Sequence, residues 1–419
     1  MILLRTFLKR LVKRGQLTVI DHTGEEHVFA GDLDGPTAAI QFTDARVAGE
    51  IARNPRLKVG ECYMDGRLVI PDGHSLYDFL QVAVQNLAYF NRQRSRPAVA
   101  LQRLSTVAAH YNPVGKAQEN VAHHYDLSGE LFDLFLDPDR QYSCAYYADP
   151  SDTLEMAQAQ KKRHIAAKLL LKPGQKVLDI GCGWGGLALY LAKQADIEVT
   201  GLTLSVEQHA VAERRAKEAG LDDRVKFKLL DYRLEEGQYD RVVSVGMFEH
   251  VGNLHYREYF TKVRDLLTDD GVAMIHTIGS ADVPGPVAGW IRKYIFPGGY
   301  LPSLSEIAPH LEQLGVWMTD FESLRLHYAE TLKAWNERFQ RHRDHIRDNL
   351  YDERFCRMWE FYLQSCEANF RESFLTVFQM QLAKNINTVP MTRDYIYEWE
   401  QAHPIEAGGL PQSMIAAGE

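Results

Sequence analysis

A glycine-rich turn carries the strongest chemical signal in the sequence. Asp179-Ile-Gly181-Cys-Gly183-Trp-Gly185-Gly186 follows an apolar run typical of a buried strand and precedes a helical pattern. Glycines at such a turn permit backbone conformations with positive φ and let amide groups approach a ligand closely. Gly181, Gly183 and Gly186 also satisfy GxGxxG, so a nicotinamide or flavin dinucleotide is the first alternative ligand.

Two features favour S-adenosylmethionine over a dinucleotide. Asp179 places a carboxylate at the end of the strand, where it can meet a cationic amino-acid group, whereas dinucleotide folds usually hold an apolar residue there. The next strand pattern ends in Gly201-Leu-Thr203-Leu-Ser205, without the acid that grips a ribose in dinucleotide folds. We therefore predict an S-adenosylmethionine site at this turn.

Neither a metal site nor a disulfide framework is predicted. His123 and His124 are adjacent, so their side chains point apart. The cysteines are odd in number, widely spaced and without a CxxC pair, which is typical of a reducing cytoplasm: Cys62, Cys144, Cys182, Cys356 and Cys366.

The elements that must position the turn belong to an α/β pattern that begins at about residue 121. Strand patterns alternate with helical patterns, which predicts a doubly wound parallel sheet. A helix over 153–171 leads into the first strand. The predicted strands span 176–180, 197–203, 225–229, 240–245 and 272–278.

The segments outside this sheet predict a second domain, because 419 residues exceed the size of one core. Residues 2–14 pattern as a basic amphipathic helix, which either lies in a membrane interface or docks on its own domain. Residues 16–90 read as a small mixed α/β domain, and 91–120 as a polar linker.

An aromatic stripe runs through the C-terminal region, over about 328–386. Its members recur at steps of three and four, which predicts a helix whose side chains are mostly core, with a few lining an acyl tunnel. The stripe comprises Phe355, Trp359, Tyr362, Cys366, Phe370, Phe374 and Phe378.

Composition restricts the partners. Hydrophobic residues make up 45% and charged residues 25% of the chain, and the net charge of −9 gives no global reason to expect nucleic acid. No apolar run approaches the roughly 18–20 residues of a membrane-spanning helix, and the N-terminal segment lacks the uninterrupted apolar stretch of a signal peptide. We expect a cytoplasmic protein.

Several runs, in one order and with coherent spacing, resemble the cyclopropane-fatty-acyl-phospholipid synthases; the mycolic-acid cyclopropane synthases are more distant. The likeness is strong over 121–385, and the first 120 residues resemble an extra domain that the mycolic-acid enzymes lack. The runs are HHYDLSGELFDLFLD (123–137), YSCAYY (142–147), VLDIGCGWGG (177–186), GLTLSVEQ (201–208), SVGMFEHVG (244–252) and HTIG (276–279).

The resemblance implies a mostly parallel, seven-stranded, Rossmann-like methyltransferase sheet with a small mixed α/β N-terminal domain. It divides the chain into a lipid-engaging domain (1–95), a linker (96–120), a catalytic domain with a helical acyl-pocket insertion (121–400) and a disordered tail (401–419). It also implies which residues contact S-adenosylmethionine: Tyr142 and Ser143 at the methionine end, Asp179, Gly181 and Gly183 at the turn, Thr203, Leu204 and Gln208 at the ribose, and Asp231 and Tyr232 at the adenine.

The implied reaction moves the sulfonium methyl onto the cis double bond of a phospholipid acyl chain. A carbocation results, and a base must remove a proton from it to close a cyclopropane ring. Family members hold bicarbonate as that base, and the implied ligands are Cys144, Glu249, His276, the backbone of Ile278, and Tyr328. Cys144 is not expected to act as a nucleophile, and His250 is expected to be structural.

Alternatives remain at this point. The same cation can lose a different proton and give a methyl- or methylene-branched acyl chain. A small-molecule N-methyltransferase and a lipid-binding module without catalysis are the other hypotheses. For the leading one we expect unsaturated phospholipids as partners, a peripheral position at the inner membrane surface brought about by the N-terminal domain, and a homodimer.

Overall fold

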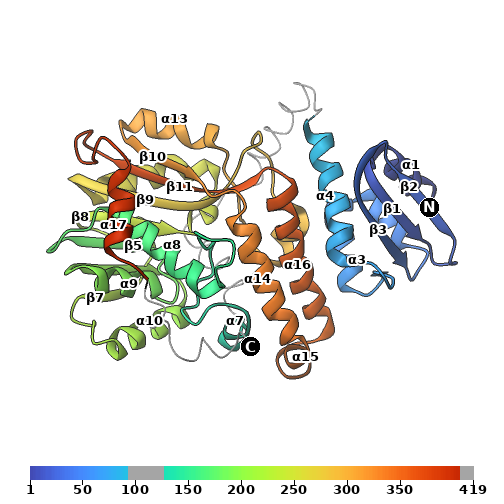
Figure 1. The fold of residues 1–419 in the computed structure, drawn as a ribbon, viewed down its shortest axis with the longest axis horizontal. Helices are drawn as coiled ribbons and strands as arrows, with labels where there is room; N and C mark the ends of the chain where they lie inside the picture. The colour runs from blue at the N-terminus through green and yellow to red at the C-terminus, as the bar shows by residue number, and fades with distance from the viewer. Residues whose placement is uncertain (93–126, 406–419) are drawn as a thin grey trace. The chain divides into compact units, whose positions relative to one another are not determined.

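The computed structural model describes residues 1–92 and 127–405. These fall into two compact units (Figure 1). The first unit comprises the described part of 1–105 together with 285–297 and 329–375. The second comprises the described parts of 106–284 and 376–419 together with 298–328. The predicted linker at 96–120 and most of the predicted tail lie outside the described residues.

The second unit is built on a seven-stranded sheet with the order β10-β11-β9-β8-β5-β6-β7. The pairs β5–β6, β5–β8, β6–β7 and β8–β9 are parallel, whereas β10 and β11 are antiparallel. The predicted mostly parallel sheet is therefore confirmed. The strands are β5 (Lys176–Ile180), β6 (Glu198–Thr203), β7 (Val225–Leu229), β8 (Tyr239–Val245), β9 (Leu267–Ser280), β10 (Trp317–Ser323) and β11 (Leu375–Ala383).

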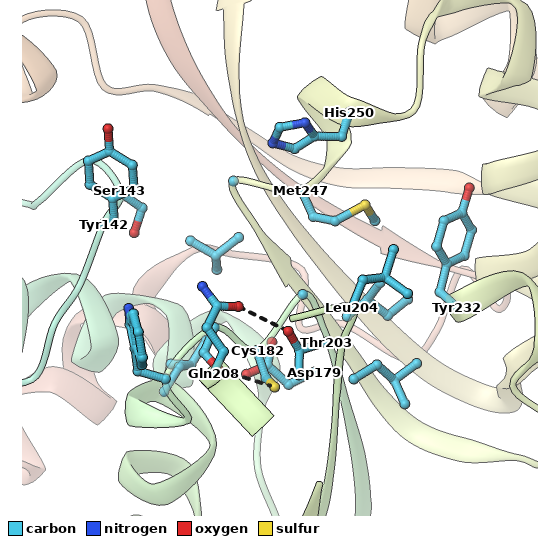
Figure 2. Close-up of a pocket in the computed structure, with 18 of the residues that line it drawn as sticks. Tyr142, Ser143, Asp179, Cys182, Thr203, Leu204, Gln208, Tyr232, Met247 and His250 are labelled. Carbon is cyan, nitrogen blue, oxygen red and sulfur yellow. Dashed lines mark hydrogen bonds between the residues drawn. The ribbon is translucent and has the colours of Figure 1, made fainter. Parts of the chain in front are cut away.

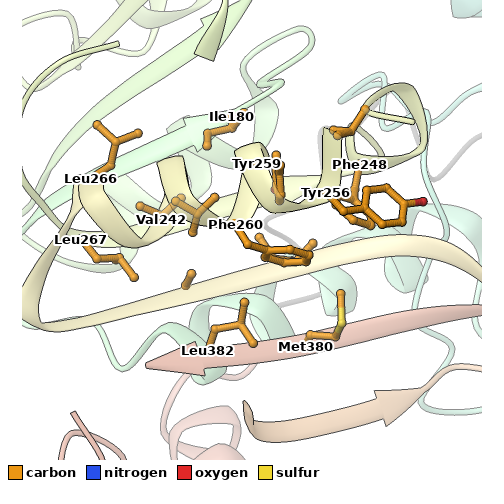
Figure 3. Close-up of a cluster of buried hydrophobic side chains, with 14 of the residues drawn as sticks. Ile180, Val242, Phe248, Tyr256, Tyr259, Phe260, Leu266, Leu267, Met380 and Leu382 are labelled. Carbon is orange, nitrogen blue, oxygen red and sulfur yellow. The ribbon is translucent and has the colours of Figure 1, made fainter. Parts of the chain in front are cut away.

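Helices cover both faces of this sheet. Successive residues of a strand point to opposite faces and therefore pack into different hydrophobic clusters. Leu178 and Val242 belong to one buried cluster with helix α11, whereas Val177 and Val243 belong to a second cluster with helices α8, α9 and α10 (Figure 3 shows the first). Such alternation is the period-two geometry of a strand buried on both sides. The helices are α7 (Gly129–Phe135), α8 (Leu154–Leu169), α9 (Gly186–Gln194), α10 (Val206–Glu218), α11 (Tyr256–Leu266), α13 (Leu304–Leu314) and α17 (Asp394–Ala402).

The predicted C-terminal stripe ends earlier than expected. Helix α16 (Glu353–Glu372) contains its first members, but Phe374 lies beyond the helix and Phe378 lies in β11. The sequence concealed this strand because β11 is buried along nearly its whole length, so the alternation that marks a half-exposed strand is missing. Strand β10 was also not predicted.

The first unit holds a mixed four-stranded sheet with the order β2-β1-β3-β4. Strand β1 pairs antiparallel with β2 and parallel with β3, as a small mixed α/β domain requires. The strands are β1 (Arg14–Ile20), β2 (Glu26–Ala30), β3 (Leu33–Phe42) and β4 (Leu68–Val69). Helices α1 (Ile2–Leu11), α2 (Val47–Arg53), α3 (Pro55–Met64) and α4 (Leu76–Arg92) accompany them. The N-terminal helix thus stops short of the predicted residue 14.

Later segments complete this unit, which differs from the predicted domain boundaries. Glu372 at the end of α16 accepts hydrogen bonds from Gln81 and Gln85 of α4, at 2.7 and 2.9 Å. Trp290 packs its ring against Phe361 of α16. The helices expected as an insertion of the catalytic domain therefore pack with the N-terminal elements: α12 (Gly289–Tyr294), most of α14 (His327–Arg341), α15 (Arg343–His345) and α16. Within the described ranges, no helix is both long and apolar enough to cross a membrane.

Candidate active site

The predicted glycine turn joins β5 to α9, and its backbone requires glycine. Gly181 and Gly183 have φ of +83° and +54°. A Cβ on Gly181 would lie 2.9 Å from the Cβ of Met247, so a side chain there has no room. A Cβ on Gly183 would meet no atom within 4 Å. One glycine allows close packing, and the other leaves open space above the turn.

That open space is a pocket at the carboxyl ends of β5, β6 and β8, the usual ligand position in a doubly wound sheet. Figure 2 shows the side chains around it. Every residue predicted to contact the cofactor lines this pocket: Tyr142, Ser143, Asp179, Gly181, Gly183, Thr203, Leu204, Gln208, Asp231 and Tyr232. Their contacts with a ligand stay a prediction.

Asp179 is the polar group in the pocket with the greatest need of a partner. Only 1% of the residue is exposed, and its Oδ2 atom has no hydrogen-bond partner among the described residues. Burial raises the pKa of this carboxyl to about 7, although the nearby Lys161 charge opposes the shift. A buried polar atom without a partner is costly, so Asp179 is suited to a ligand that brings a positive charge or a donor.

The loop after β6 orients an amide toward the pocket. The Thr203 hydroxyl donates to Oε1 of Gln208 at 2.9 Å (Figure 2), and the Ser205 hydroxyl caps helix α10 by accepting from the Gln208 amide. Because the oxygen of the Gln208 side chain is already used, its NH₂ group remains as a donor.

Asp231 lines the pocket, but its carboxylate is already paired. Its two oxygens accept from the Arg233 backbone and guanidinium at 2.7 to 3.0 Å. The pair stabilises the short 3₁₀ turn Tyr232–Leu234. The ring of Tyr232 packs edge-on against Tyr259. Asp231 therefore shapes this wall through its pair with Arg233.

Lys161 supports the opposite wall, and sequence reasoning did not find it. It is fully buried, and its Nζ donates to Oε1 of Gln141 and to the hydroxyl of Ser143 at 2.7 and 2.8 Å. Burial lowers the pKa of this ammonium to about 7. No local pattern separates Lys161 from the adjacent Lys162, because both belong to one charged run of α8. His250, expected to be structural, also lines the pocket, and burial lowers its pKa to about 4.

Comparison with known proteins identifies the family. The model of the mycolic acid cyclopropane synthetase family matches residues 114–380. The chain belongs to this family. It is therefore an S-adenosylmethionine-dependent methyltransferase.

Relatives of this methyltransferase differ in how much of it they cover. The cyclopropane-fatty-acyl-phospholipid synthase of Escherichia coli strain K12 is 48% identical over 63% of this chain and 67% of its own length. The tuberculostearic acid methyltransferase UfaA1 of Mycobacterium tuberculosis is 38% identical over 85% of both chains. The crystal structure of mycolic acid cyclopropane synthase CmaA1 complexed with SAH and CTAB is 33% identical, with a TM-score of 0.61, covering 65% of this chain and 99% of that one.

A second group of polar residues in the methyltransferase is buried and includes Glu249. Glu249 is 7% exposed, and its Oε1 accepts the backbone N–H of Ile278 at 2.6 Å. Its Oε2 has no partner among the described residues, and burial raises the pKa of the carboxyl to about 7. The backbone amide of Ile278, one of the implied anion ligands, is therefore already hydrogen-bonded to another of them, Glu249.

His276 precedes Ile278 by two positions on β9, which places both residues on the same side of the strand. Its Nδ1 lies 3.2 Å from Nε2 of Gln379 on β11. Burial, followed by the charge of Lys161, lowers the pKa of His276 well below its usual value. The imidazole is therefore neutral at physiological pH.

Cys144 and Tyr328 are buried on two segments that pack together. The amide of Tyr147 donates to Nδ1 of His327 at 3.0 Å, and the ring of Tyr146 stacks on the same imidazole. The Cys144 thiol lies 3.3 Å from the carbonyl of Ala145. The structure thus joins Glu249 directly to Ile278 and the Cys144 segment to the Tyr328 segment, and the Lys161 charge acts on both Cys144 and His276.

Away from this site, the first unit brings together Asp21, Glu25 and His27, whose ligand atoms are close enough to share a cation. His27 already contacts the Asp21 carboxylate at 3.2 Å, and Asp21 accepts three further bonds from Thr23 and Glu25. The cluster is satisfied as a turn between β1 and β2.

Proposed function

We propose that this methyltransferase transfers the methyl group of S-adenosylmethionine to the cis double bond of an unsaturated phospholipid acyl chain and closes a cyclopropane ring. The observation that supports it most directly is the pairing of an open glycine-lined pocket with a separate buried polar group. Methyl transfer needs the first, and deprotonation of a carbocation needs the second. The identity of 48% to a cyclopropane-fatty-acyl-phospholipid synthase points to the same substrate class.

We assign the pocket residues as follows. Asp179 pairs with the ammonium of the methionine moiety, which supplies the partner that its Oδ2 lacks. The free NH₂ of Gln208 donates to a ribose hydroxyl. Tyr232 packs against the adenine, on a wall that the Asp231–Arg233 pair holds in place.

The chemistry also needs exact placement and a dry cavity. An alkene is a weak nucleophile, so the chain must hold the double bond in line with the methyl carbon and the departing sulfur. Excluding water protects the carbocation that results. Bicarbonate, when bound, supplies the base for the final proton. Glu249 fits beside such an anion, because its free Oε2 and its raised pKa let it accept or give a hydrogen bond.

Lipid mass spectrometry tests this proposal. The purified chain is incubated with methyl-labelled S-adenosylmethionine and vesicles of unsaturated phospholipid, in bicarbonate-free buffer and in buffer with bicarbonate. We expect label in a cyclopropane ring, formed faster when bicarbonate is present. Label in a branched chain would contradict ring closure. The two products can be distinguished because a ring and a branch give different fragmentation patterns.

Methyl transfer without ring closure is the second candidate. The names of two relatives mention methyl transfer and no cyclopropane: a probable fatty acid methyltransferase of Pseudomonas putida, 40% identical, and the tuberculostearic acid methyltransferase, which matches along most of this chain. The same cation leads to either product, and the position of the base decides between them.

We also propose that the first unit engages the membrane surface through the tip of α1. Leu4 and Leu8 are buried in their own unit, so this part of the apolar face of α1 packs within the protein. Ile2 and Leu3 remain 85% and 67% exposed, and Lys9 of the same helix is exposed as well. Exposed apolar residues next to basic ones are typical of interfacial helices.

Vesicle flotation tests the membrane contact. The double variant Ile2→Ser, Leu3→Ser should bind vesicles about tenfold more weakly, with unchanged affinity for S-adenosylmethionine. Leu87→Ser, at an exposed leucine of α4 in the same unit, is the matched control. Deleting the whole helix is less informative, because it would also remove Leu4 and Leu8 from the core. Equal flotation of all variants would refute the membrane contact. The predicted homodimer is a separate matter, which light scattering of the wild-type protein would test.

A further inference from the structure

Gln379 lies between a buried lysine and His276. Its Oε1 accepts from Nζ of Lys168 at 2.9 Å, and its Nε2 lies 3.2 Å from Nδ1 of His276. Both Lys168 and Gln379 are fully buried, and His276 is almost so. These side chains come from α8, β11 and β9, three separate parts of the second unit.

The chemistry of the three groups fixes the direction of both hydrogen bonds. An ammonium only donates, so the oxygen of the Gln379 amide must face Lys168. The NH₂ group then faces His276 and donates to Nδ1. A neutral imidazole that accepts at Nδ1 carries its proton on Nε2.

We propose that Lys168 and Gln379 are positioning residues that hold His276 in the tautomer with the proton on Nε2. This inference rests on the proposed function, with His276 as one of the implied ligands of the anionic base. The Nε2 hydrogen then gives the anion a donor, whereas the opposite tautomer would present a lone pair and repel it. Conversion to the imidazolium is opposed by burial and by the charges of Lys161 and Lys168.

The lysine is itself held by charged neighbours. Its Nζ forms ion pairs with Glu322 and Asp320 of β10. The imidazole of His164, one turn before Lys168 on α8, lies between Glu322 and Glu400 of α17, at 2.7 Å from each. The charges of Glu322 and Asp320 compensate the buried ammonium of Lys168 and fix its orientation. The fixed ammonium in turn fixes the orientation of the Gln379 amide.

Nitrogen NMR of the full-length protein tests the tautomer directly. Histidine labelled with ¹⁵N in the ring is incorporated, and the signals of His276 are identified among the 16 histidines by their loss in His276→Gln. Near neutral pH we expect a neutral ring with the proton on Nε2. A proton on Nδ1, an imidazolium, or an equal mixture of tautomers would each overturn the proposal.

Variants then test the cause. Gln379→Leu should remove the tautomer preference, and Gln379→Glu, which accepts but does not donate, should move the proton to Nδ1. Gln381→Leu is the matched control, because Gln381 is equally buried on the same face of β11 but contacts the Lys168 carbonyl and Tyr395. The His276 spectrum should be unchanged there. Unchanged His276 spectra in both Gln379 variants would overturn the role of Gln379.

Kinetics separate this inference from the proposed function. Initial rates measured against sodium bicarbonate in degassed buffer should give a KM for bicarbonate about tenfold higher in Gln379→Leu, with an unchanged KM for S-adenosylmethionine. If the wild-type rate does not depend on bicarbonate, the proposed base is wrong, and the tautomer measurement still stands. If bicarbonate matters but its KM is the same in Gln379→Leu, the positioning role is wrong.

Discussion

The glycine-lined pocket and the buried polar residues that include Glu249 each contain one carboxylic acid, and the pKa values of these two acids are similar. Asp179 and Glu249 both have one oxygen without a partner among the described residues, and burial raises the pKa of each to about 7. Their surroundings differ. Asp179 lines an open pocket, whereas Glu249 does not line it and is tied to a strand amide. Two acids with a similar pKa can therefore be proposed for different roles, Asp179 as the partner of a cationic ligand and Glu249 as a neighbour of the anionic base, because their surroundings differ.

The largest expected effect tests Glu249. Glu249→Gln keeps the size of the side chain and an oxygen for the Ile278 amide, but it loses the proton that titrates. We expect kcat to fall at least about 100-fold, the lower range for loss of a group that takes part in proton transfer. The affinity for S-adenosylmethionine, measured by calorimetry, should be unchanged. If Glu249→Gln keeps the wild-type kcat, Glu249 has a structural role only, and the proposed difference in role between Asp179 and Glu249 is wrong.

The comparison also shows which features the sequence could predict. The pocket is built from short contiguous runs, each placed at the end of a parallel strand: the turn at Gly181–Gly186 after β5 and the loop at Thr203–Ser205 after β6. The pattern of the Asp179–Gly186 turn predicted a ligand site by itself, whereas most of the other lining residues were indicated by the family resemblance. The mostly parallel, doubly wound sheet followed from the alternation of strands and helices.

The buried polar residues could not be predicted from residue spacing, because they lie on segments far apart in the sequence. Gln379 lies in a strand whose complete burial hid it, and it contacts a lysine 211 positions away. Lys161 has no sequence signal, since its burial depends on how α8 packs on the sheet. The implied anion ligands were indicated only by the family resemblance, and Gln379 and Lys161 were not indicated at all. The grouping of α16 with α4 was missed for the same reason.

A pH experiment tests the other acid, Asp179. At about pH 5.5 a carboxyl with a pKa of about 7 is almost entirely protonated, and at about pH 7 half of it is ionised. A cationic ligand selects the ionised form. The affinity for S-adenosylmethionine should therefore rise roughly tenfold over this interval, as calorimetry at several pH values would show.

Two variants give this experiment its controls. Asp179→Asn should bind more weakly and without the rise. Asp231→Asn changes a carboxylate that is already paired with Arg233, so the rise should persist. A rise that survives in Asp179→Asn would mean that another group with a pKa in this interval, such as Lys161, titrates instead.

Lys161 tests whether the two regions are independent. Its ammonium bonds to Ser143 in the pocket, and its charge also acts on Cys144 and His276. Lys161→Met removes the charge at similar length and leaves Ser143 and Gln141 without their donor. We expect affinity for S-adenosylmethionine to fall about fivefold, with a further loss in kcat. An effect on affinity alone would restrict Lys161 to the pocket. Lys162→Met, which removes the adjacent charge of α8, is the control for a general electrostatic effect.

The smallest effect distinguishes the space above the glycine turn from the packing below it. Gly183→Ala adds a Cβ in open space, at a cost of about 1–2 kcal/mol for the left-handed backbone, and should weaken S-adenosylmethionine binding about threefold. Gly185→Ala would bring a Cβ to 2.8 Å from the Phe227 ring and 3.0 Å from Ala212, within the core. It should lower the Tm far more. If Gly183→Ala instead destabilised the fold as much as Gly185→Ala, the turn above β5 would be a packing feature, and the pocket would lose its distinction from the buried polar group.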